Sequence, residues 1–353
     1  MASTCQALVL HGAQDLRLES KPVSPPQGAE VQVAIKATGL CGSDLHYYNH
    51  GRNGDFVVRE PMCLGHESSG IVTAIGPEVT TLQPGDRVAL EVGLPCRKCL
   101  LCRQGRYNLC PGMRFRSSAK TFPHLDGTLL ELTNHPAAMC HKLPESVSYA
   151  GGALVEPLAV CLHAIRRSNP PSKPDTDAAA LAESDKPTAL IFAPAPSASS
   201  WPQPSPQQNP SPPSSSPTST PRDAPPAEQT AHALQTAQHV AAALKATAAA
   251  ATANPETEMP GFTRVYDCTG VPACTLPVGA AALREVDIIG VFRYDGYAYP
   301  AAIQLMESGK FAVVEEKVVT HRLGLAEGVR AFALAGKGVD ETGKPVVKVV
   351  IES

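Results

Sequence analysis

The sequence predicts an α/β protein of two domains, the first of which is an irregular β domain. With 353 residues, the chain is long enough for about two domains with apolar cores. The first 150 residues contain short apolar stretches separated by turns that carry Gly and Pro, which is the pattern of many short strands. Between Gly152 and Gly261 there is no glycine at all, so a different kind of sequence separates this β domain from the strand and helix patterns that follow.

The clearest strand pattern is at residues 30–37 (EVQVAIKA). Its apolar residues Val31, Val33 and Ile35 alternate with others, the period of a half-buried strand. Residues 69–75 and 86–91 are similar short apolar stretches. Several such strands with turns between them indicate a partly open barrel or sandwich.

Later segments predict a change of architecture. Residues 151–165 (GGALVEPLAVCLHAI) are mostly apolar and predict a buried helix that leads out of the β domain. Residues 264–267 and 286–292 predict buried strands, residues 302–334 mix helical and strand patterns, and residues 345–351 (PVVKVVI) predict an edge strand.

The segment without glycine has an unusual composition. From residue 194 to 226, 12 of 33 residues are Pro and 9 are Ser, too few apolar groups to offset the entropy of ordering. We therefore expect residues 166–185 and 194–226 to be largely disordered. Residues 228–251 are rich in Ala and predict a helix.

Charge and composition exclude several classes of function. Lys and Arg number 30 against 33 Asp and Glu, so the chain lacks the basic excess of a nucleic-acid or membrane-surface binder. No run of about 18 apolar residues and no secretory segment occurs. We expect a cytoplasmic protein without nucleic-acid or membrane partners, in which the 11 Cys are metal ligands and core residues.

Four cysteines are spaced as a metal-binding lobe. Cys96, Cys99, Cys102 and Cys110 follow the pattern C-x2-C-x2-C-x7-C within fifteen residues. Four thiolates held this close suit a closed tetrahedral Zn²⁺ site. An iron–sulfur cluster or four unligated thiols are the alternatives, and nothing else in the sequence indicates electron transfer.

A second, wider set combines Cys41, His66, Glu67 and Glu156. One thiolate, one imidazole and one or two carboxylates form the mixed donor set of a catalytic zinc site, which keeps a position open for water or substrate. Taken singly, such residues are more often part of a core.

The motif GHE-x2-G-x5-G runs from Gly65 to Gly76. Together with residues 37–58, 61–72, 84–113, 142–160 and 282–294, it resembles the zinc-dependent medium-chain dehydrogenase/reductase superfamily. Within this superfamily, the chain most resembles the polyol dehydrogenases of fungal type, which act on sorbitol, xylitol or L-arabinitol. The resemblance implies a GroES-like zinc catalytic domain at residues 1–160, to which residues 297–353 return. Residues 161–296 would form a truncated, degraded Rossmann-like, doubly wound α/β domain, with a disordered insert near 166–260.

The resemblance also implies a role for each matching residue. It implies one catalytic and one structural Zn²⁺, NAD as cofactor and a polyol substrate. Relatives form homo-oligomers. Glu156 would bind the catalytic zinc directly or through water, Ser43 and His46 would relay the substrate proton, and Glu156 would also contact the polyol. The full assignment is metal: Cys41, His66, Glu67, Glu156, Cys96, Cys99, Cys102 and Cys110; catalytic: Ser43, His46 and Glu156; substrate: Tyr47, Phe115, Glu156, Arg293 and Tyr294; cofactor: Val291, Phe292 and Arg293.

One feature departs from the family pattern. Where a dinucleotide-binding fold has G-x-G-x-x-G, this chain has Ala193, Ala195 and Ala198, and a Cβ at these positions opposes both the tight turn and the approach of pyrophosphate. Three explanations are a paralogue that has lost dinucleotide binding, a misassembled coding sequence, and a divergent cofactor domain. Two functions are therefore compatible with the sequence: an NAD-linked polyol dehydrogenase, and a redox-inactive zinc-binding protein of the same descent.

Overall fold

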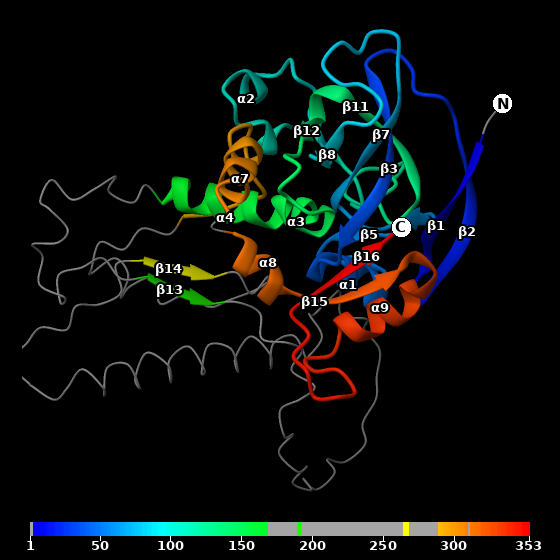
Figure 1. Ribbon diagram of the computed structural model, residues 1–353, viewed down its shortest axis with the longest axis vertical. Coiled ribbons are helices and arrows are strands. Elements are labelled where there is room, and N and C mark those ends of the chain that lie inside the picture. Colours follow the sequence, from blue (N-terminus) through cyan, green and yellow to red (C-terminus); the bar gives the residue numbers. More distant parts are fainter. Residues whose placement is uncertain (1–2, 169–188, 193–263, 268–288, 310) are drawn as a thin grey trace, which may run out of the picture. The chain divides into compact units, whose positions relative to one another are not determined.

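The computed structural model describes residues 3–168, 189–192, 264–267, 289–309 and 311–353 (Figure 1). Contacts divide the chain into two units. The first unit contains residues 3–168 and the described residues from 289 onward, with both metal-ligand sets predicted from the sequence. Within the second unit, strands β13 (Ala189–Phe192) and β14 (Arg264–Asp267) pair in parallel, so residues 264–267 form the predicted strand.

A mixed sheet organises the first unit. Its strands follow the order β12-β8-β7-β3-β16-β15, and β11 also pairs with β3. All pairs in it are antiparallel except β15 with β16. The bounds are β3 Glu30–Gly39, β7 Glu67–Ile75, β8 Arg87–Leu90, β11 Leu132–Pro136, β12 Cys140–Lys142, β15 Val319–Gly324 and β16 Lys348–Glu352.

The predicted strands of the β domain are present. In β3, Val31, Val33 and Ile35 are fully buried and the residues between them are partly exposed, as the alternating pattern predicts. Strands β7 and β8 match the predicted segments 69–75 and 86–91 within two residues at either end.

The prediction of an edge strand at residues 345–351 was wrong in its position. Strand β16 lies inside the sheet, between β3 and β15, as the red and blue strands of Figure 1 show. Its residues Val349, Val350 and Ile351 are all buried, because both edges of the strand are paired and both faces are covered.

Smaller ribbons complete the β domain. A three-stranded sheet has the order β2-β1-β6, and two-stranded ribbons join β4 to β5 and β9 to β10. The bounds are β1 Ser3–Gly12, β2 Asp15–Val23, β4 Arg52–Asn53, β5 Phe56–Val57, β6 Met62–Cys63, β9 Gly93–Leu94 and β10 Arg114–Phe115.

Helices and short 3-10 turns connect the strands. Their bounds are α1 Gly42–His50, α2 Leu100–Arg103, η1 Tyr107–Leu109, η2 Ala137–Met139, α3 Tyr149–Ala153, α4 Val155–Arg167, α7 Ala298–Glu307, α8 Ala312–Val318, η5 Leu325–Glu327 and α9 Gly328–Ala335. The predicted helix at 151–165 is therefore real, divided between α3 and α4, and α7 packs along α4 (Figure 1). Within the described residues, no helix is both long enough and apolar enough to cross a membrane.

Two predicted boundaries need correction. Arg166 and Arg167, expected at the start of a disordered stretch, form the last turn of α4, where basic side chains offset the helix dipole. Residues 289–292 of the predicted strand 286–292 are not a strand, and Val291 and Phe292 are each 40% exposed, since no described strand pairs with them.

Other predictions lie outside the described residues. These are the disorder of residues 169–185 and 194–226, the helix at 228–251, and the alanines at 193, 195 and 198 of the dinucleotide motif.

A buried polar pair connects β11 to the loop after β10. Arg116 Nε donates to His135 Nδ1 (3.1 Å), and His135 Nε2 lies 3.0 Å from the carbonyl oxygen of Glu91. Because Nδ1 accepts, the proton must sit on Nε2 and donate to that carbonyl. Burial, followed by the positive charge of Arg116, lowers the pKa of His135 to about 3.

This low pKa predicts that acid destabilises the protein. In the unfolded chain the pKa of His135 returns to about 6.5, so only the unfolded state takes up this proton as the pH falls from 6.5 towards 3. We expect a loss of about 1.4 kcal/mol of unfolding free energy per pH unit in this window, measured by urea denaturation. His135→Gln should remove this part of the slope, whereas variation of the exposed His50 to Gln should keep it. Equal slopes in wild type and His135→Gln would contradict the assignment.

Candidate metal centre and substrate cavity

Strand pairing brings the second metal-ligand set together. Strands β3 and β7 run antiparallel with Gly39 opposite Glu67, so the end of β3 and the start of β7 meet at one edge of the sheet. Cys41 follows β3 by two residues and His66 precedes β7 by one. The Cys41 Sγ, a His66 ring nitrogen and a Glu67 carboxylate oxygen all lie within 4.8 Å of one another.

Steric constraints explain why glycine occupies two positions of the GHE-x2-G-x5-G motif. Gly65 has φ +91°, a conformation that L side chains rarely adopt, and it turns the chain so that His66 enters the site. A Cβ on Gly70 would lie 2.2 Å from the Ala34 carbonyl oxygen, so only glycine lets β7 approach β3 this closely. Outside the motif, Gly39 makes room for Glu67, because a Cβ there would lie 2.3 Å from Glu67 Oε2.

Asp44 fixes the two ends of the site, and the sequence analysis did not assign it a role. Its carboxylate is fully buried and accepts from the backbone N–H groups of Cys41 (3.1 Å) and Gly65 (3.1 Å). Oδ1 also accepts from Ser117 Oγ (2.8 Å) and lies 3.4 Å from His66 Nδ1. The local signal was available, since Asp44 is the third residue of α1 and forms a capping box with Cys41.

Lys348 is the second residue that sequence analysis missed. Its Nζ donates to both Glu67 oxygens (2.9 and 2.7 Å) and to the Leu40 carbonyl oxygen (3.1 Å). Strand β16 pairs with β3 so that Val350 faces Gly39, which brings Lys348 to the edge that carries Cys41. Since 281 residues separate Lys348 from Glu67, no local spacing could have indicated the pair.

Buried groups of both charges surround the donor set. Asp44, Glu67 and Glu156 are each at most 6% exposed, and the positive groups near them are His66, Lys348 and Arg293. Burial raises the pKa of Glu156 to about 7, and nearby Glu67 adds to the effect. Burial by itself would lower the pKa of His66, but Asp44 and Cys41 raise it well above its usual value. The donors are a thiolate, an imidazole and a carboxylate, and a divalent metal that favours this combination fits them.

A cavity of about 190 Å³ is lined in part by His66, one of these ligands. It lies within the first unit, and its lining comprises Ser43, Tyr47, Asn53, Phe56, His66, Phe115, Ser117, Ser118, Glu156, Phe292 and Arg293. Ser43 Oγ is 3.5 Å from His66 Nε2, and Tyr47 Oη accepts from the Ala119 N–H (3.0 Å). Glu156 shares this wall but is not one of the mutually close donors, which favours contact through water over direct ligation.

Arg293 is held in an unusual backbone conformation at the cavity wall. Its φ of +55° is rare for a residue with a side chain. The guanidinium carbon lies 3.5 Å from the centroid of the Phe115 ring, and Nη1 is buried without a hydrogen-bond partner. A strained residue with an unpaired donor facing a cavity is well placed to bind an oxygen of a ligand.

Apart from the ligands Cys41 and Glu67, three residues expected at the site do not line this cavity. His46 is exposed on α1, with its ring 6.2 Å from that of His50. Tyr294 is buried in the core against Tyr299, with ring centroids 5.0 Å apart. Val291 is exposed one residue before Phe292. The predictions for these residues came from resemblance, and no contact in this cavity supports them.

The four-cysteine set also converges. All four thiol sulfurs of Cys96, Cys99, Cys102 and Cys110 lie within 4.8 Å of one another, and none is in a disulfide. The Cys99 and Cys102 sulfurs are 3.4 Å apart and those of Cys96 and Cys102 are 4.0 Å apart, close to the edge of about 3.8 Å of a tetrahedron with metal–sulfur bonds of about 2.3 Å. Backbone N–H groups of Lys98 and Cys99 lower the pKa of Cys96 to about 6, whereas burial and the neighbouring thiols raise the pKa of Cys102 to about 12, so Cys96 is the thiol that more readily forms a thiolate.

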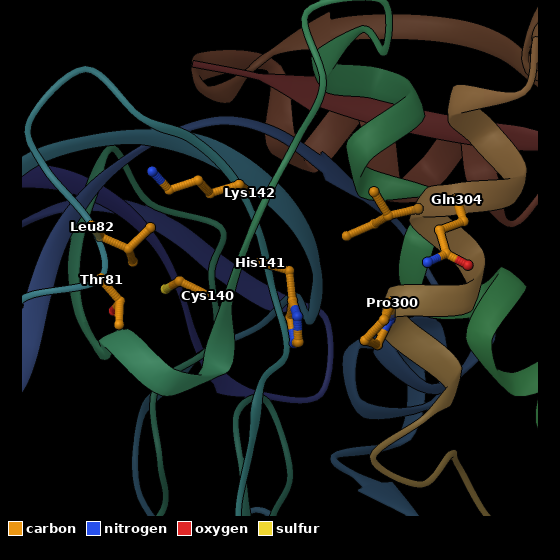
Figure 2. A pocket seen from close by; sticks show the side chains of 8 residues that line it. Thr81, Leu82, Cys140, His141, Lys142, Pro300 and Gln304 are labelled. Atoms are coloured by element: carbon orange, nitrogen blue, oxygen red, sulfur yellow. The ribbon is translucent and has the colours of Figure 1, made fainter.

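A second cavity lacks this chemistry. It has a volume of about 470 Å³ and is lined by residues of β12, α7 and the loop before β8; His141 lies on the side of Pro300, and the Lys142 side chain points away from α7 (Figure 2). Its two basic side chains are already paired, His141 with Glu91 (2.6 Å) and Lys142 with Asp86 (2.9 Å). The smaller cavity at Cys41 and His66 is therefore the candidate active site.

Comparison with known proteins agrees with this arrangement. Residues 27–145 match the alcohol dehydrogenase GroES-like domain. Sorbitol dehydrogenase of Gallus gallus is 36% identical over 375 residues, covering 96% of each chain. D-xylulose reductase A of Aspergillus oryzae is 33% identical over 348 residues, covering 94% of each chain.

Solved structures share the fold. L-Idonate 5-dehydrogenase of Escherichia coli has a TM-score of 0.67 at 19% identity, over 100% of this chain and 99% of that chain. An alcohol dehydrogenase of Escherichia coli CFT073, whose structure contains NADH, has a TM-score of 0.64 at 18% identity, over 99% and 100%.

Lys348 provides a test of the charge balance at the metal centre. Lys348→Met leaves the Glu67 carboxylate, 1% exposed, without its charge partner, so the metal-free protein should lose about 3 kcal/mol of unfolding free energy in urea denaturation. The matched control is Lys142→Met, since Lys142 is 57% exposed and its pair with Asp86 should contribute less than about 1 kcal/mol. Similar losses in both variants would contradict a special role for Lys348.

Proposed function

Because the chain belongs to the zinc-dependent medium-chain dehydrogenase/reductase family, in its polyol dehydrogenase group, we propose that it oxidises a small polyol. The substrate class is sorbitol or xylitol, the product is the 2-ketose, and the hydride passes to NAD. One observation carries the proposal: His66, which clusters with Cys41 and Glu67 as a metal-ligand set, lines the same cavity as the Ser43 hydroxyl and the Glu156 carboxylate.

Cys41, His66 and Glu67 would hold a catalytic zinc, whose Lewis acidity lowers the pKa of a substrate hydroxyl. Ser43, whose Oγ lies 3.5 Å from His66 Nε2, is positioned to accept the proton of that hydroxyl and donate its own onward. His46 is one helical turn further along α1 and exposed, so it can pass the proton to solvent.

Other groups of the cavity suit a substrate with several hydroxyls. Arg293 offers unpaired N–H donors, Asn53 offers an amide, and Glu156 offers a carboxylate. Each hydroxyl of a polyol that enters a closed site needs such a partner, because an unsatisfied polar group costs affinity. Phe115 and Phe56 supply the apolar walls that exclude water around the reacting carbon.

The hydride acceptor is proposed from family membership. Phe292 lines the cavity and is 40% exposed, so a nicotinamide ring can approach this wall. The residues that would cradle its phosphates lie outside the described part of the chain. Relatives that match over 94% to 96% of the chain, including its segment without glycine, do not favour a redox-inactive zinc protein.

Two zinc ions per chain are expected. Metal analysis by mass spectrometry of zinc-loaded, dialysed protein should give about two zinc per chain. The double variant Cys99→Ser/Cys102→Ser should retain about one, and so should Cys41→Ser/His66→Asn. Cys161→Ser, at an exposed position outside both sets, should retain about two. If either double variant still bound about two zinc ions per chain, the metal site assigned to its mutated residues would be wrong.

Turnover should depend on Ser43. Ser43→Ala should lower kcat/KM for sorbitol or xylitol about 100-fold, the usual loss when a positioned proton acceptor is removed, without changing the zinc content. The measurement follows NADH formation by absorbance. Ser308→Ala, at an exposed position on the end of α7, is the matched control and should keep wild-type rates. No turnover of any polyol by zinc-loaded wild type would instead support the redox-inactive alternative.

A further inference from the structure

A third cavity has positively charged side chains that the proposed reaction does not use, and it shares Phe292 with the substrate cavity. Its volume is about 380 Å³, and it lies within the first unit between the four-cysteine lobe, the end of α4 and the segment before α7. Arg106, Asn108, Leu109, His163, Arg166, Arg167, Gly290, Phe292 and Asp295 line it.

The arginines outnumber the carboxylates that could neutralise them. Asp295, 4% exposed, is the one acidic residue of the lining, and it forms an ion pair with Arg166. Arg166 is also stacked on Tyr297, with 4.9 Å between its guanidinium carbon and the ring centroid. Arg106 and Arg167 are exposed and have no ion pair among the described residues. Two guanidinium groups therefore face the cavity uncompensated.

Helix capping explains these charges only in part. Arg166 and Arg167 belong to the last turn of α4, where basic side chains commonly offset the helix dipole. Arg106 comes from the loop between α2 and η1 and has no such role in α4. Arg106 therefore joins the α4 arginines in this lining from a separate element.

A buried imidazole completes the lining. His163 is 6% exposed, and its Nδ1 has no hydrogen-bond partner, although Asp295 Oδ2 lies 3.3 Å away. Burial lowers the pKa of His163, and the charges of Arg166, Arg167 and Arg106 lower it further. All three guanidinium groups are therefore close enough to affect this imidazole. Asn108 Nδ2 donates to the Phe292 carbonyl oxygen (2.8 Å) and holds the opposite wall.

We propose that this cavity binds the phosphate group of a small molecule, at a site separate from the metal centre. Guanidinium groups match the geometry of phosphate oxygens and form charge-assisted hydrogen bonds with them. Arg106 and Arg167 supply the free donors, while Asp295 keeps Arg166 in place. The phosphate belongs either to a free phosphate ion or to a phosphorylated sugar, and both present the same dianion.

Calorimetric titration of the zinc-loaded full chain with inorganic phosphate tests this site. At low ionic strength we expect saturable binding of one phosphate with a Kd of about 1 mM. Arg106→Gln and Arg167→Gln should each weaken binding about tenfold, since each removes a charge-assisted contact. Arg103→Gln, an exposed variant in α2 that does not line the cavity, should bind as wild type does. Circular dichroism and thermal midpoints would check that each variant is folded.

Further arms identify the source of the phosphate. Tighter binding of sorbitol 6-phosphate than of phosphate would assign the site to phosphorylated sugars, and equal binding would assign it to the free ion. Three results would overturn the proposal: no saturable binding up to about 20 mM, an equal loss in Arg103→Gln, or displacement of phosphate by NADH. Because the assay measures binding and not turnover, failure of the polyol reaction leaves its outcome intact.

Discussion

The pairing of β3 with β7 and β16 is the constraint on which the metal centre depends. Gly39 lies opposite both Glu67 on β7 and Val350 on β16, so the ends of three strands meet at one edge of the sheet. Cys41, His66 and Lys348 all follow from that register. A slip of one residue would point each side chain to the opposite face and dismantle the donor set. Glycines at 39 and 70 permit the close approach that fixes the register.

Buried ionisable groups of both charges meet at this edge. Asp44, Glu67 and Glu156 are buried within one site, with His66, Lys348 and Arg293 near them. Burying such groups is costly unless they are paired and hydrogen-bonded. Asp44 accepts from the backbone N–H groups of Cys41 and Gly65, and these hydrogen bonds fix the chain at the donor groups.

Local patterns in the sequence predicted much of the fold and the ligands. The alternation in 30–37 gave a strand, and the spacing from Cys96 to Cys110 gave a thiol cluster, because both depend on neighbours in the chain. The role of Lys348 could not be predicted from local sequence, because its partner Glu67 is 281 residues away. The edge strand at 345–351 was misplaced for the same reason, since pairing on both sides with β3 and β15 is non-local. Tyr294 matched a family position, yet packing directs it into the core.

We expect two chemically different zinc sites to coexist in the first unit. X-ray absorption at the zinc edge of the fully loaded protein tests this expectation most directly. The spectrum should show mixed coordination, with sulfur at about 2.3 Å and nitrogen or oxygen at about 2.0–2.1 Å, averaging about 2.5 sulfurs per zinc. A shell of four sulfurs alone would contradict it, because zinc would then occupy only the cysteine lobe and the edge formed by β3, β7 and β16 would not be a metal centre.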